Sequence, residues 1–415
     1  MRRRRQPMNR HSNDSPNRNP NPNPQAGTEM RLPWNLAELF ATPQVTAVSE
    51  MDEDDVSALW IEGLPYQGKP TRVFAYYGLP QASKVSASGG KAPAMVLVHG
   101  GGGTAFKEWV RIWTHRGYAA IAMDVEGHWP TEKTESGAWP KHAWSGPCRQ
   151  GEFADYALPV AEQWMYHAVA AVILSHSFLR TQDGVDPGRI GIHGISWGGI
   201  LTGLVAGVDH RFAFAIPVYG CGYLFEAENQ YGRSFTAMPP ACAEKIKRLW
   251  DPSAYLHRIA IPTLWVHWSD DPHFPLHLFS KSYESARNGL KESVMSIHLD
   301  LGHSHAKGWK PQEIYAFADQ IALGGVKLPQ VIRSYIRDRQ AKVVYACDMP
   351  VTKAELLHTS DTSSWFDIHW QVSEAHIDPS VQEISAALPE NARACFFQMT
   401  DERGYVVSSP IRLHG

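Results

Sequence analysis

The most specific chemical signal in the chain is a serine framed by glycines: residues 194–199 read GISWGG, with Ser196 in third place. The segment stands between an apolar, strand-like run at residues 189–193 (RIGIH) and an apolar, helix-like run that begins at Ile200. In a strand-to-helix turn of the pattern G-x-S-x-G the serine is strained, and the glycines are needed because a Cβ would clash with the neighbouring strand or helix. We therefore predict that Ser196 is a nucleophile; a purely structural glycine-rich turn is the alternative.

A second glycine-rich segment, HGGGGT at residues 99–104, directly follows the apolar run AMVLV at residues 94–98. Acyl transfer to a serine generates an oxyanion, which needs backbone N–H donors in a water-poor site. One donor is the N–H of the residue after the nucleophile, here Trp197, and the second comes from this loop, at Gly101 or Gly102. Because the loop follows a buried-type strand, a flexible linker is disfavoured. A phosphate-binding loop is disfavoured as well, because no Gly-Lys-Ser/Thr ending follows.

Chain order predicts an acid after the serine, and a histidine after the acid. The strand-like run at residues 263–267 is followed by WSDDP, which contains Asp270 and Asp271. Either carboxylate can orient an imidazole and stabilise its protonated form. We expect Asp271 in this role, with Asp270 as the alternative.

The histidine is expected within GHSH at residues 302–305, which follows the strand-like run at residues 294–299. A general base belongs just past the last strand, so we expect His303, with His305 as the alternative. The His-Ser-His spacing is also compatible with metal ligation, but no cysteine or carboxylate pair stands at ligand spacing, so no metal is expected. Serine, acid, histidine and glycine loop, in this order, predict an acyl-transfer enzyme.

Alternating strands and helices are predicted to hold these segments in place. From about residue 70 to 325, short apolar runs alternate with longer amphipathic stretches. Strands are expected at residues 71–77, 94–98, 118–123, 189–193, 212–218, 263–267 and 294–299, and helices at 106–116, 161–180 and 200–208. This alternation is typical of βαβ units, so we predict an α/β fold with a mostly parallel sheet flanked by helices.

After residues 324–329 the pattern changes to short runs rich in β-branched and aromatic residues. Strands are expected at residues 342–346, 353–358, 367–371, 392–398 and 404–407. We therefore predict a catalytic domain at residues 31–328, with an insertion at about 127–163, and a small all-β sandwich at 329–415. The sandwich can bind polysaccharide, mediate dimerisation or cover an apolar face of the catalytic domain, and the sequence does not separate these roles.

Composition narrows the class of protein further. Residues 1–30 consist largely of Asn, Pro, Arg and Ser and are expected to be disordered. A net charge of -3 gives no reason to expect a nucleic-acid partner. No apolar run reaches the ~18 residues that a membrane span needs, so the cytoplasm is the default location, and the oligomeric state is left open. Five widely separated cysteines favour free thiols over a disulfide scaffold.

At these motifs the chain resembles the α/β-hydrolase superfamily, and more narrowly the acetyl xylan esterase and cephalosporin-deacetylase-like group with its prolyl-oligopeptidase-like neighbours. The resemblance covers about residues 60–325. It rests on HGGGG at 99–103, GISWGG at 194–199, PTLWVHWSDD at 262–271 and GHSH at 302–305. Ser304 departs from the His-Gly that is usual after the last strand. The resemblance implies ester hydrolysis through an acyl-enzyme without a cofactor, with acetyl groups on carbohydrate as a candidate substrate.

Aromatic residues of the insertion suggest a site for a sugar. The insertion carries Trp129, Trp139 and Trp144, and together with Trp197 and Trp268 they can line a cleft where sugar rings stack. Of these, Trp129, Trp144 and Trp268 are the substrate-binding residues that we expect; packing of a lid is the alternative.

Two other functions compete with the esterase. A dipeptidyl or acylaminoacyl peptidase needs a carboxylate pair for a substrate ammonium or an Arg for an acyl oxygen, and Glu126 alone is thin evidence for that. About 30–40 residues before the first strands are also too few for the propeller that such peptidases usually carry. A non-catalytic carbohydrate-binding protein is the other alternative.

Overall fold

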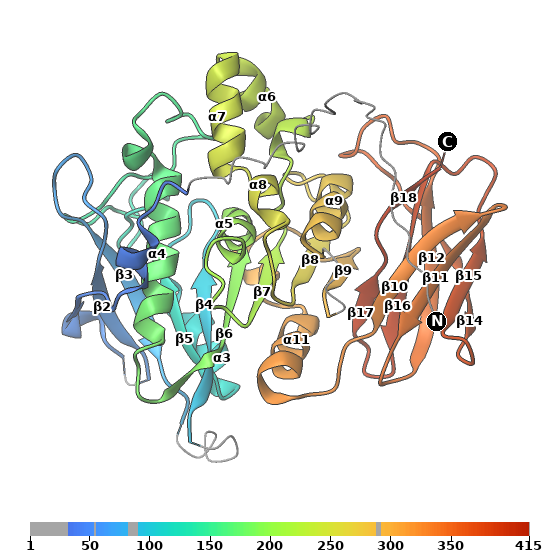
Figure 1. Cartoon of the computed structure of the whole chain (residues 1–415), viewed down its shortest axis with the longest axis horizontal. Coiled ribbons are helices and arrows are strands. Elements are labelled where there is room, and N and C mark those ends of the chain that lie inside the picture. Colours follow the sequence, from blue (N-terminus) through green and yellow to red (C-terminus); the bar gives the residue numbers. More distant parts are fainter. Residues whose placement is uncertain (1–31, 54, 82–89, 288–291, 415) are drawn as a thin grey trace, which may run out of the picture. The chain divides into compact units, whose positions relative to one another are not determined.

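The computed structural model describes residues 32–53, 55–81, 90–287 and 292–414. The predicted disorder of residues 1–30 lies outside these ranges. A nine-stranded sheet forms the core of the described chain (Figure 1). In spatial order its strands are β1 (Val45–Ala47), β2 (Ser57–Glu62), β3 (Arg72–Gly78), β5 (Ala119–Met123), β4 (Ala92–Val98), β6 (Val185–Ile195), β7 (Phe214–Val218), β8 (Leu264–Trp268) and β9 (Val294–His298).

The predicted parallel sheet is confirmed for the part of the sheet from β5 to β9, where the strands run parallel to one another. Every residue of β4, β5 and β7 is buried, as expected for parallel strands covered by helices on both faces. At the other end, β1, β2, β3 and β5 pair antiparallel. Of β1–β3 only β3 was predicted; β1 is a short exposed strand with little apolar pattern.

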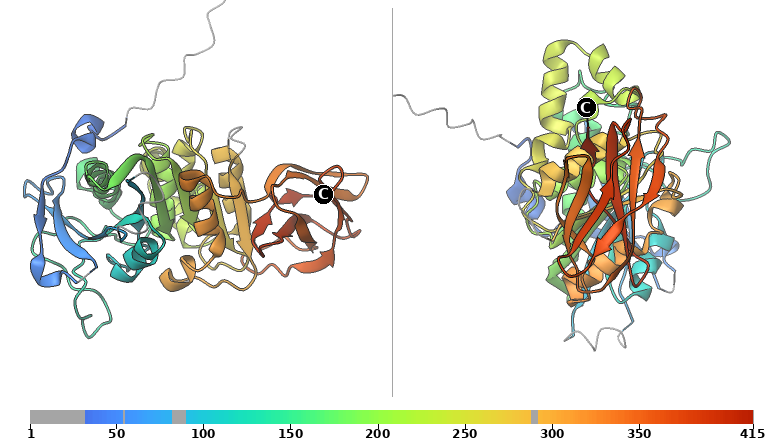
Figure 2. Two further views of the ribbon diagram at one scale, coloured as in Figure 1. Left: turned by 90° about the horizontal axis from the view of Figure 1, so that it is seen from below. Right: turned by 90° about the vertical axis from the view of Figure 1, so that its right-hand side faces the viewer.

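Helices cover both faces of this sheet (Figure 2). One row consists of α1 (Leu36–Phe40), α4 (Trp164–Leu179), α5 (Trp197–Ala206), α8 (Ser253–Leu256) and α9 (Leu276–Arg287), each in contact with the next. The opposite face carries α3 (Lys107–His115) and α11 (Gln312–Leu323), where the rings of Trp113 and Tyr315 lie 5.0 Å apart. Of the described α-helices only α3, α4 and α5 were predicted. Among the others, α6 (Gln230–Ala237) and α7 (Pro240–Trp250) follow β7, and the short α10 (His305–Gly308) follows β9.

The predicted insertion at about residues 127–163 contains no α-helix or extended strand within the described chain. Its regular features are an isolated bridge between His128 and Lys141 and a 3-10 turn at Val160–Glu162. Helix α4 consequently begins at Trp164, three residues later than predicted.

Two antiparallel sheets form the C-terminal β domain, as predicted for this part of the chain. The first has the order β10 (Gln330–Arg337), β11 (Gln340–Ala346), β15 (Glu383–Ala387), β14 (His376–Asp378), and the second β13 (Gln371–Glu374), β12 (Val351–Thr359), β16 (Ala394–Asp401), β17 (Val406–Ser408), with β18 (Arg412–Leu413) also paired to β16. The strand predicted at residues 367–371 was wrong, since 367–370 form an irregular segment. In this segment Trp370 packs edge-on against Phe396.

The β domain covers the open edge of the large sheet at β9. Gln398 donates to the carbonyl of Ile297 (2.6 Å), and the N–H of Ile297 donates to the hydroxyl of Ser408 (3.0 Å). Ser296 in turn donates to the carbonyl of Val406 (2.7 Å). An uncovered edge strand exposes unpaired backbone groups that invite aggregation. These contacts therefore give the β domain a structural role at this edge.

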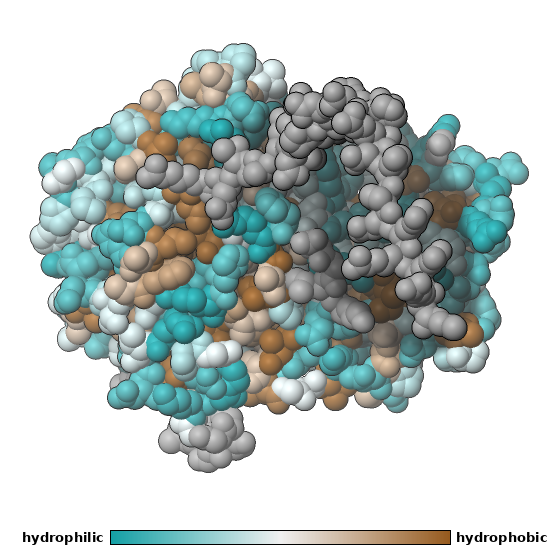
Figure 3. All heavy atoms as spheres, in the orientation of Figure 1, coloured by the Kyte–Doolittle hydropathy of each residue, from teal (hydrophilic) through white to brown (hydrophobic). Residues whose placement is uncertain are grey.

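Large apolar side chains on the described surface are scattered. Val45, Leu79, Trp144, Leu323, Val326, Ile332, Val372, Val381 and Leu413 are exposed. On the face seen in Figure 3, hydrophobic residues are likewise interspersed with hydrophilic ones. Single exposed apolar residues are ordinary in globular proteins. Among the described helices, none combines the length and apolar character needed to cross a membrane.

Candidate active site

Ser196 occupies a sharp turn between the end of β6 and the start of α5. Its backbone has φ 60° and ψ −116°, a conformation that a residue with a side chain rarely adopts. The N–H of Ser196 donates to the carbonyl of Val218 in the neighbouring strand β7 (2.9 Å). A Cβ at Gly194 would lie 2.0 Å from the carbonyl oxygen of Gly198, so helix and strand approach more closely here than any side chain permits. The structure thus contains the strained turn that the GISWGG sequence predicts.

This close approach makes a stability prediction. A Cβ on Gly198 would lie 2.0 Å from the carbonyl oxygen of Val98, a backbone atom that cannot rotate away. We expect Gly198→Ala to lower the free energy of unfolding by about 3 kcal/mol or more, as measured by urea denaturation. Gly188→Ala is the control, because Gly188 is exposed and its nearest neighbour would lie 3.4 Å away. Equal stability of the two variants would contradict the tight packing described here.

His303 and Asp271 meet at the carboxyl ends of β8 and β9. Nδ1 of His303 lies 2.6 Å from Oδ2 of Asp271, while Oδ1 of Asp271 accepts from the N–H groups of His273 (2.8 Å) and Phe274 (2.9 Å). Burial by itself raises the pKa of Asp271, but the hydrogen bonds from His303 and the backbone outweigh it and hold the pKa below the usual value. An ionised Asp271 accepts a hydrogen bond from a protonated Nδ1, which leaves Nε2 of His303 without a proton and able to accept one.

The two alternative residues lie elsewhere. Asp270 is exposed on the turn after β8. His305 is turned toward the glycine loop, residues 99–103, where its Nε2 accepts a hydrogen bond from the N–H of Gly100 (2.9 Å). Burial lowers the pKa of His305 to about 4, so this ring is neutral near neutral pH and can serve as that acceptor. The geometry therefore pairs Asp271 with His303 and gives His305 a contact with the loop.

Tyr219, which the sequence analysis did not single out, supports the His303 ring. It directly follows β7, and its ring stacks on that of His303 with centroids 4.4 Å apart. Its hydroxyl donates to the carbonyl of Gly302 (2.7 Å), and burial raises the pKa of Tyr219. No motif marks this residue, because only the fold brings the end of β7 beside the loop that carries His303.

The glycine loop is anchored to the segment that follows β5. Nδ1 of His128 lies 2.7 Å from the carbonyl oxygen of Gly103, and the N–H of Gly102 points to Oε2 of Glu126 (3.4 Å). Gly101, in contrast, lines the cavity at Ser196. Of the two donors left open by the sequence, the geometry therefore favours the N–H of Gly101.

A cavity of about 290 Å³ opens at Ser196. It is lined by Gly101 of the glycine loop, by Arg149 and Glu152 of the insertion, by Ile195, Ser196 and Trp197 of the serine turn, by Gln230 and Tyr231 of α6, and by His273, His303, Ser304 and His305 of the loops after β8 and β9. Arg149, Glu152, Gln230 and His273 were missed by sequence analysis, since no spacing connects the insertion or α6 with the serine. These four side chains are all polar or charged.

The three predicted substrate-binding tryptophans do not line this cavity. Trp129 stacks on Trp60 with centroids 5.0 Å apart, Trp144 lies under the guanidinium of Arg72 at 4.4 Å, and Trp268 donates to the carbonyl of Leu299 (3.0 Å). None of the three therefore lies in the cavity at Ser196, and their expected role in binding sugar stays a prediction. Aromatic content in the sequence does not distinguish packing from binding.

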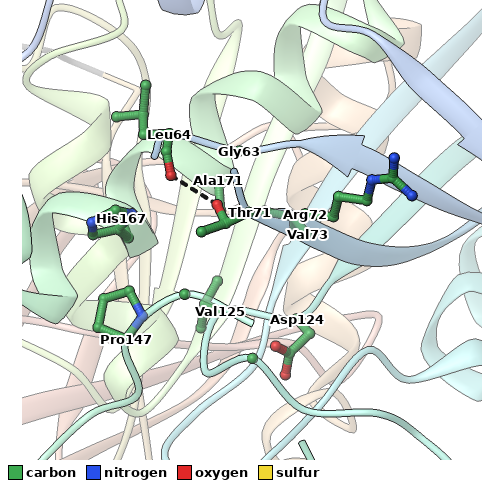
Figure 4. Close-up of a pocket in the computed structure, with 12 residues that line it drawn as sticks. Gly63, Leu64, Thr71, Arg72, Val73, Asp124, Val125, Pro147, His167 and Ala171 are labelled. Atoms are coloured by element: carbon green, nitrogen blue, oxygen red, sulfur yellow. Dashed lines mark hydrogen bonds between the residues drawn. The ribbon is translucent and has the colours of Figure 1, made fainter. Parts of the chain in front are cut away.

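A smaller cavity of about 30 Å³ lies between the start of β3 and the segment after β5 (Figure 4). Thr71 donates to the carbonyl of Leu64 there (2.8 Å), and the carboxylate of Asp124 faces the same space. Within the described residues, Oδ1 of Asp124 has no hydrogen-bond partner. The volume suits about one water molecule rather than a substrate. Among all the residues that the structure describes, no cluster of three or more His, Cys, Asp or Glu side chains is arranged to hold a metal.

Two family models match the chain. Residues 38–228 match the acetyl xylan esterase (AXE1) model, and residues 149–322 match the prolyl oligopeptidase family. The two ranges overlap at the serine turn, and the second extends across both Asp271 and His303.

Individual relatives are distant. "Uncharacterized peptidase YuxL" of Bacillus subtilis (strain 168) is 24% identical over 135 residues, which cover 31% of this chain and 20% of that protein. Acetyl xylan esterase 1 from Thermoanaerobacterium sp. JW/SL YS485 is 17% identical with a TM-score of 0.51, over 70% of this chain and 95% of that one. Acetyl xylan esterase from Paenibacillus sp. R4 is 21% identical with a TM-score of 0.46, over 69% and 92%. At such identities the Thermoanaerobacterium structure supports the fold alone.

Proposed function

We propose that this chain removes small acyl groups, foremost acetyl, from a carbohydrate ester. It is an α/β-hydrolase of the serine hydrolase type to which acetyl xylan esterases and prolyl oligopeptidases belong. The observation that carries this proposal is the set of polar groups in the cavity around Ser196. Arg149, Glu152, Gln230 and His273 all line it. Hydroxyl groups of a sugar find both donors and acceptors among them, whereas a long acyl chain would bury these groups without hydrogen-bond partners.

In the first proposed step, Ser196 attacks the ester carbonyl. His303 accepts the serine proton on Nε2, because the carboxylate of Asp271 occupies its Nδ1 side at 2.6 Å. Asp271 stays ionised and stabilises the imidazolium that forms. The ring stack with Tyr219 limits rotation of His303 away from the serine.

The negative charge that develops on the carbonyl oxygen is stabilised by backbone donors. Trp197 is the first residue of α5, where the N–H groups have no acceptor within the helix. The N–H of Gly101 in the glycine loop is the second proposed donor. Such donors stabilise the transition state more than the substrate, because the full charge exists only on the tetrahedral oxygen.

The sugar alcohol then leaves with the proton from His303, and the acetyl group remains on Ser196. Water, deprotonated by the same histidine, attacks this acyl-enzyme and releases acetate. No cofactor takes part in either step.

One observation favours a second candidate, a serine peptidase that acts on aminoacyl amides. The carboxylate of Glu152 lies in the cavity, where it can hold a substrate ammonium group. A substrate panel separates the two candidates.

We expect the purified protein to release acetate from acetylated xylo-oligosaccharide, and to act on aryl acetate faster than on aryl butyrate or octanoate. Aminoacyl anilides should be poor substrates. The Ser196→Ala variant supplies the blank for every substrate. Rapid anilide cleavage without sugar deacetylation would instead establish the peptidase, and octanoate preference would contradict the carbohydrate ester.

A further inference from the structure

We propose that Arg149 supplies a third donor, and the only cationic one, to the oxyanion that forms at Ser196; this inference rests on the serine mechanism proposed above. Arg149 belongs to the insertion after β5, which carries no motif for catalysis. Its guanidinium nevertheless lines the cavity together with Ser196, Trp197 and Gly101.

The position of the guanidinium follows from the space beside Gly101. A Cβ on Gly101 would lie 2.7 Å from Nη2 of Arg149 and 3.0 Å from Cδ1 of Trp197. Nη2 therefore approaches the α-carbon of Gly101 on the side where Trp197 also approaches it. Glycine is required here, since any side chain would push the guanidinium away from the two residues that carry the proposed backbone donors.

The guanidinium is held in place on its other sides. Nε of Arg149 donates to Oε1 of Glu126 (3.1 Å), and Nη1 donates to the carbonyl of Gly151 (2.9 Å). Its central carbon lies 5.0 Å from the ring centre of Trp197. In the described part of the chain, no group accepts a hydrogen bond from Nη2. Arg149 thus presents the unused NH₂ group of Nη2, held in place by the bonds of Nε and Nη1, and preorganisation of this kind is what an oxyanion donor needs.

The surrounding charges favour a transient anion over a bound one. Glu126 is almost fully buried and already pairs with Arg149, and Glu152 adds a second carboxylate to the cavity region. A permanent carboxylate on the substrate would meet this negative charge and find only one unused nitrogen, whereas Arg binds carboxylates best through two. A single oxygen that becomes negative only during reaction fits one nitrogen.

Glu126 also contacts the glycine loop. Its Oε2 lies 3.4 Å from the N–H of Gly102 while its Oε1 holds Arg149. One buried carboxylate therefore positions both the guanidinium and the glycine loop. We regard Glu126 as a positioning residue, because it contacts Arg149 and the glycine loop but does not itself line the cavity.

The test compares Arg149→Ala and Arg149→Lys with wild type on 4-nitrophenyl acetate, a neutral ester. We expect kcat to fall about 10²-fold in Arg149→Ala, with KM changed by less than about threefold, because the lost donor acts on the transition state. A methyl trifluoromethyl ketone, which forms a tetrahedral oxyanion with a serine, should bind more weakly by a similar factor. Added guanidinium at millimolar concentration should restore part of the activity of Arg149→Ala.

Controls separate this inference from a structural role and from the serine mechanism itself. Arg233→Ala removes an exposed arginine of α6 outside the cavity lining and should behave as wild type. The inference is overturned if kcat of a folded Arg149 variant on this neutral ester is unchanged, or if guanidinium restores nothing. Should Arg149→Ala fail to fold, Arg149→Lys is judged by kcat, KM and ketone affinity. A fully active Ser196→Ala would instead refute the serine mechanism, whatever the Arg149 variants do.

Discussion

Ser196→Ala is expected to lower kcat for aryl acetate hydrolysis roughly 10⁶-fold while leaving the fold intact. The serine turn is determined by the backbone of Gly194 and Gly198 and by the hydrogen bond from the N–H of Ser196 to Val218, none of which involves the serine hydroxyl. Alanine therefore removes only the nucleophile. The residual rate reflects the oxyanion donors, which remain in place.

Covalent labelling measures the same property independently of any substrate. A fluorophosphonate should modify wild type at Ser196, as located by peptide mass spectrometry, and should leave Ser196→Ala unlabelled. Thermal unfolding of the two proteins provides the control for folding. Labelling at a different serine, or activity that survives the substitution, would show that another group carries the reaction.

The second large effect is expected for Asp271→Asn, which should lower kcat about 10⁴-fold. The reason lies in the three hydrogen bonds of this side chain. Oδ1 accepts from the N–H groups of His273 and Phe274, so an asparagine must keep its carbonyl oxygen there and turn its NH₂ group toward His303. Two donors would then face each other unless His303 moves its proton to Nε2. In that tautomer His303 cannot accept the proton of Ser196.

A matched control lies one residue away. Asp270→Asn makes the same chemical change at an exposed position of the same turn, and we expect an activity close to that of wild type. Rate measurements from pH 5 to 9 test the tautomer argument, because a higher pH should not restore Asp271→Asn. Equal losses in the two variants would mean that general electrostatics, and not the contact with His303, account for the effect.

The central part of the fold was predictable because it follows from local pattern. Buried parallel strands such as β4 and β5 consist of apolar runs whose length and flanking glycines indicate a strand directly. The edges of the sheet were harder to predict. Strand β1 is exposed and was not predicted, and although β9 was predicted, its contacts with the β domain about 110 residues later were not. Tertiary packing decides which segments cover an edge strand, and the local pattern of apolar residues does not predict it.

The same division runs through the candidate site. The sequence by itself determined the serine turn, the glycine loop and the order of acid and histidine, because each depends on backbone conformations and neighbours within a few residues. It favoured His303 but left His305, two residues away, open as the alternative. Only the fold decides that Asp271 faces His303, while His305 turns to the N–H of Gly100.

The lining of the cavity was decided by tertiary structure alone. Trp129, Trp144 and Trp268 carry the aromatic surface that suits sugar binding, yet each packs against groups away from Ser196. Arg149 and Gln230, from segments without a recognisable pattern, lie in the cavity instead. A nucleophile that depends on one strained turn can be predicted from residues adjacent in the sequence. Recognition depends on side chains from distant segments, whose meeting is set by packing of the whole chain.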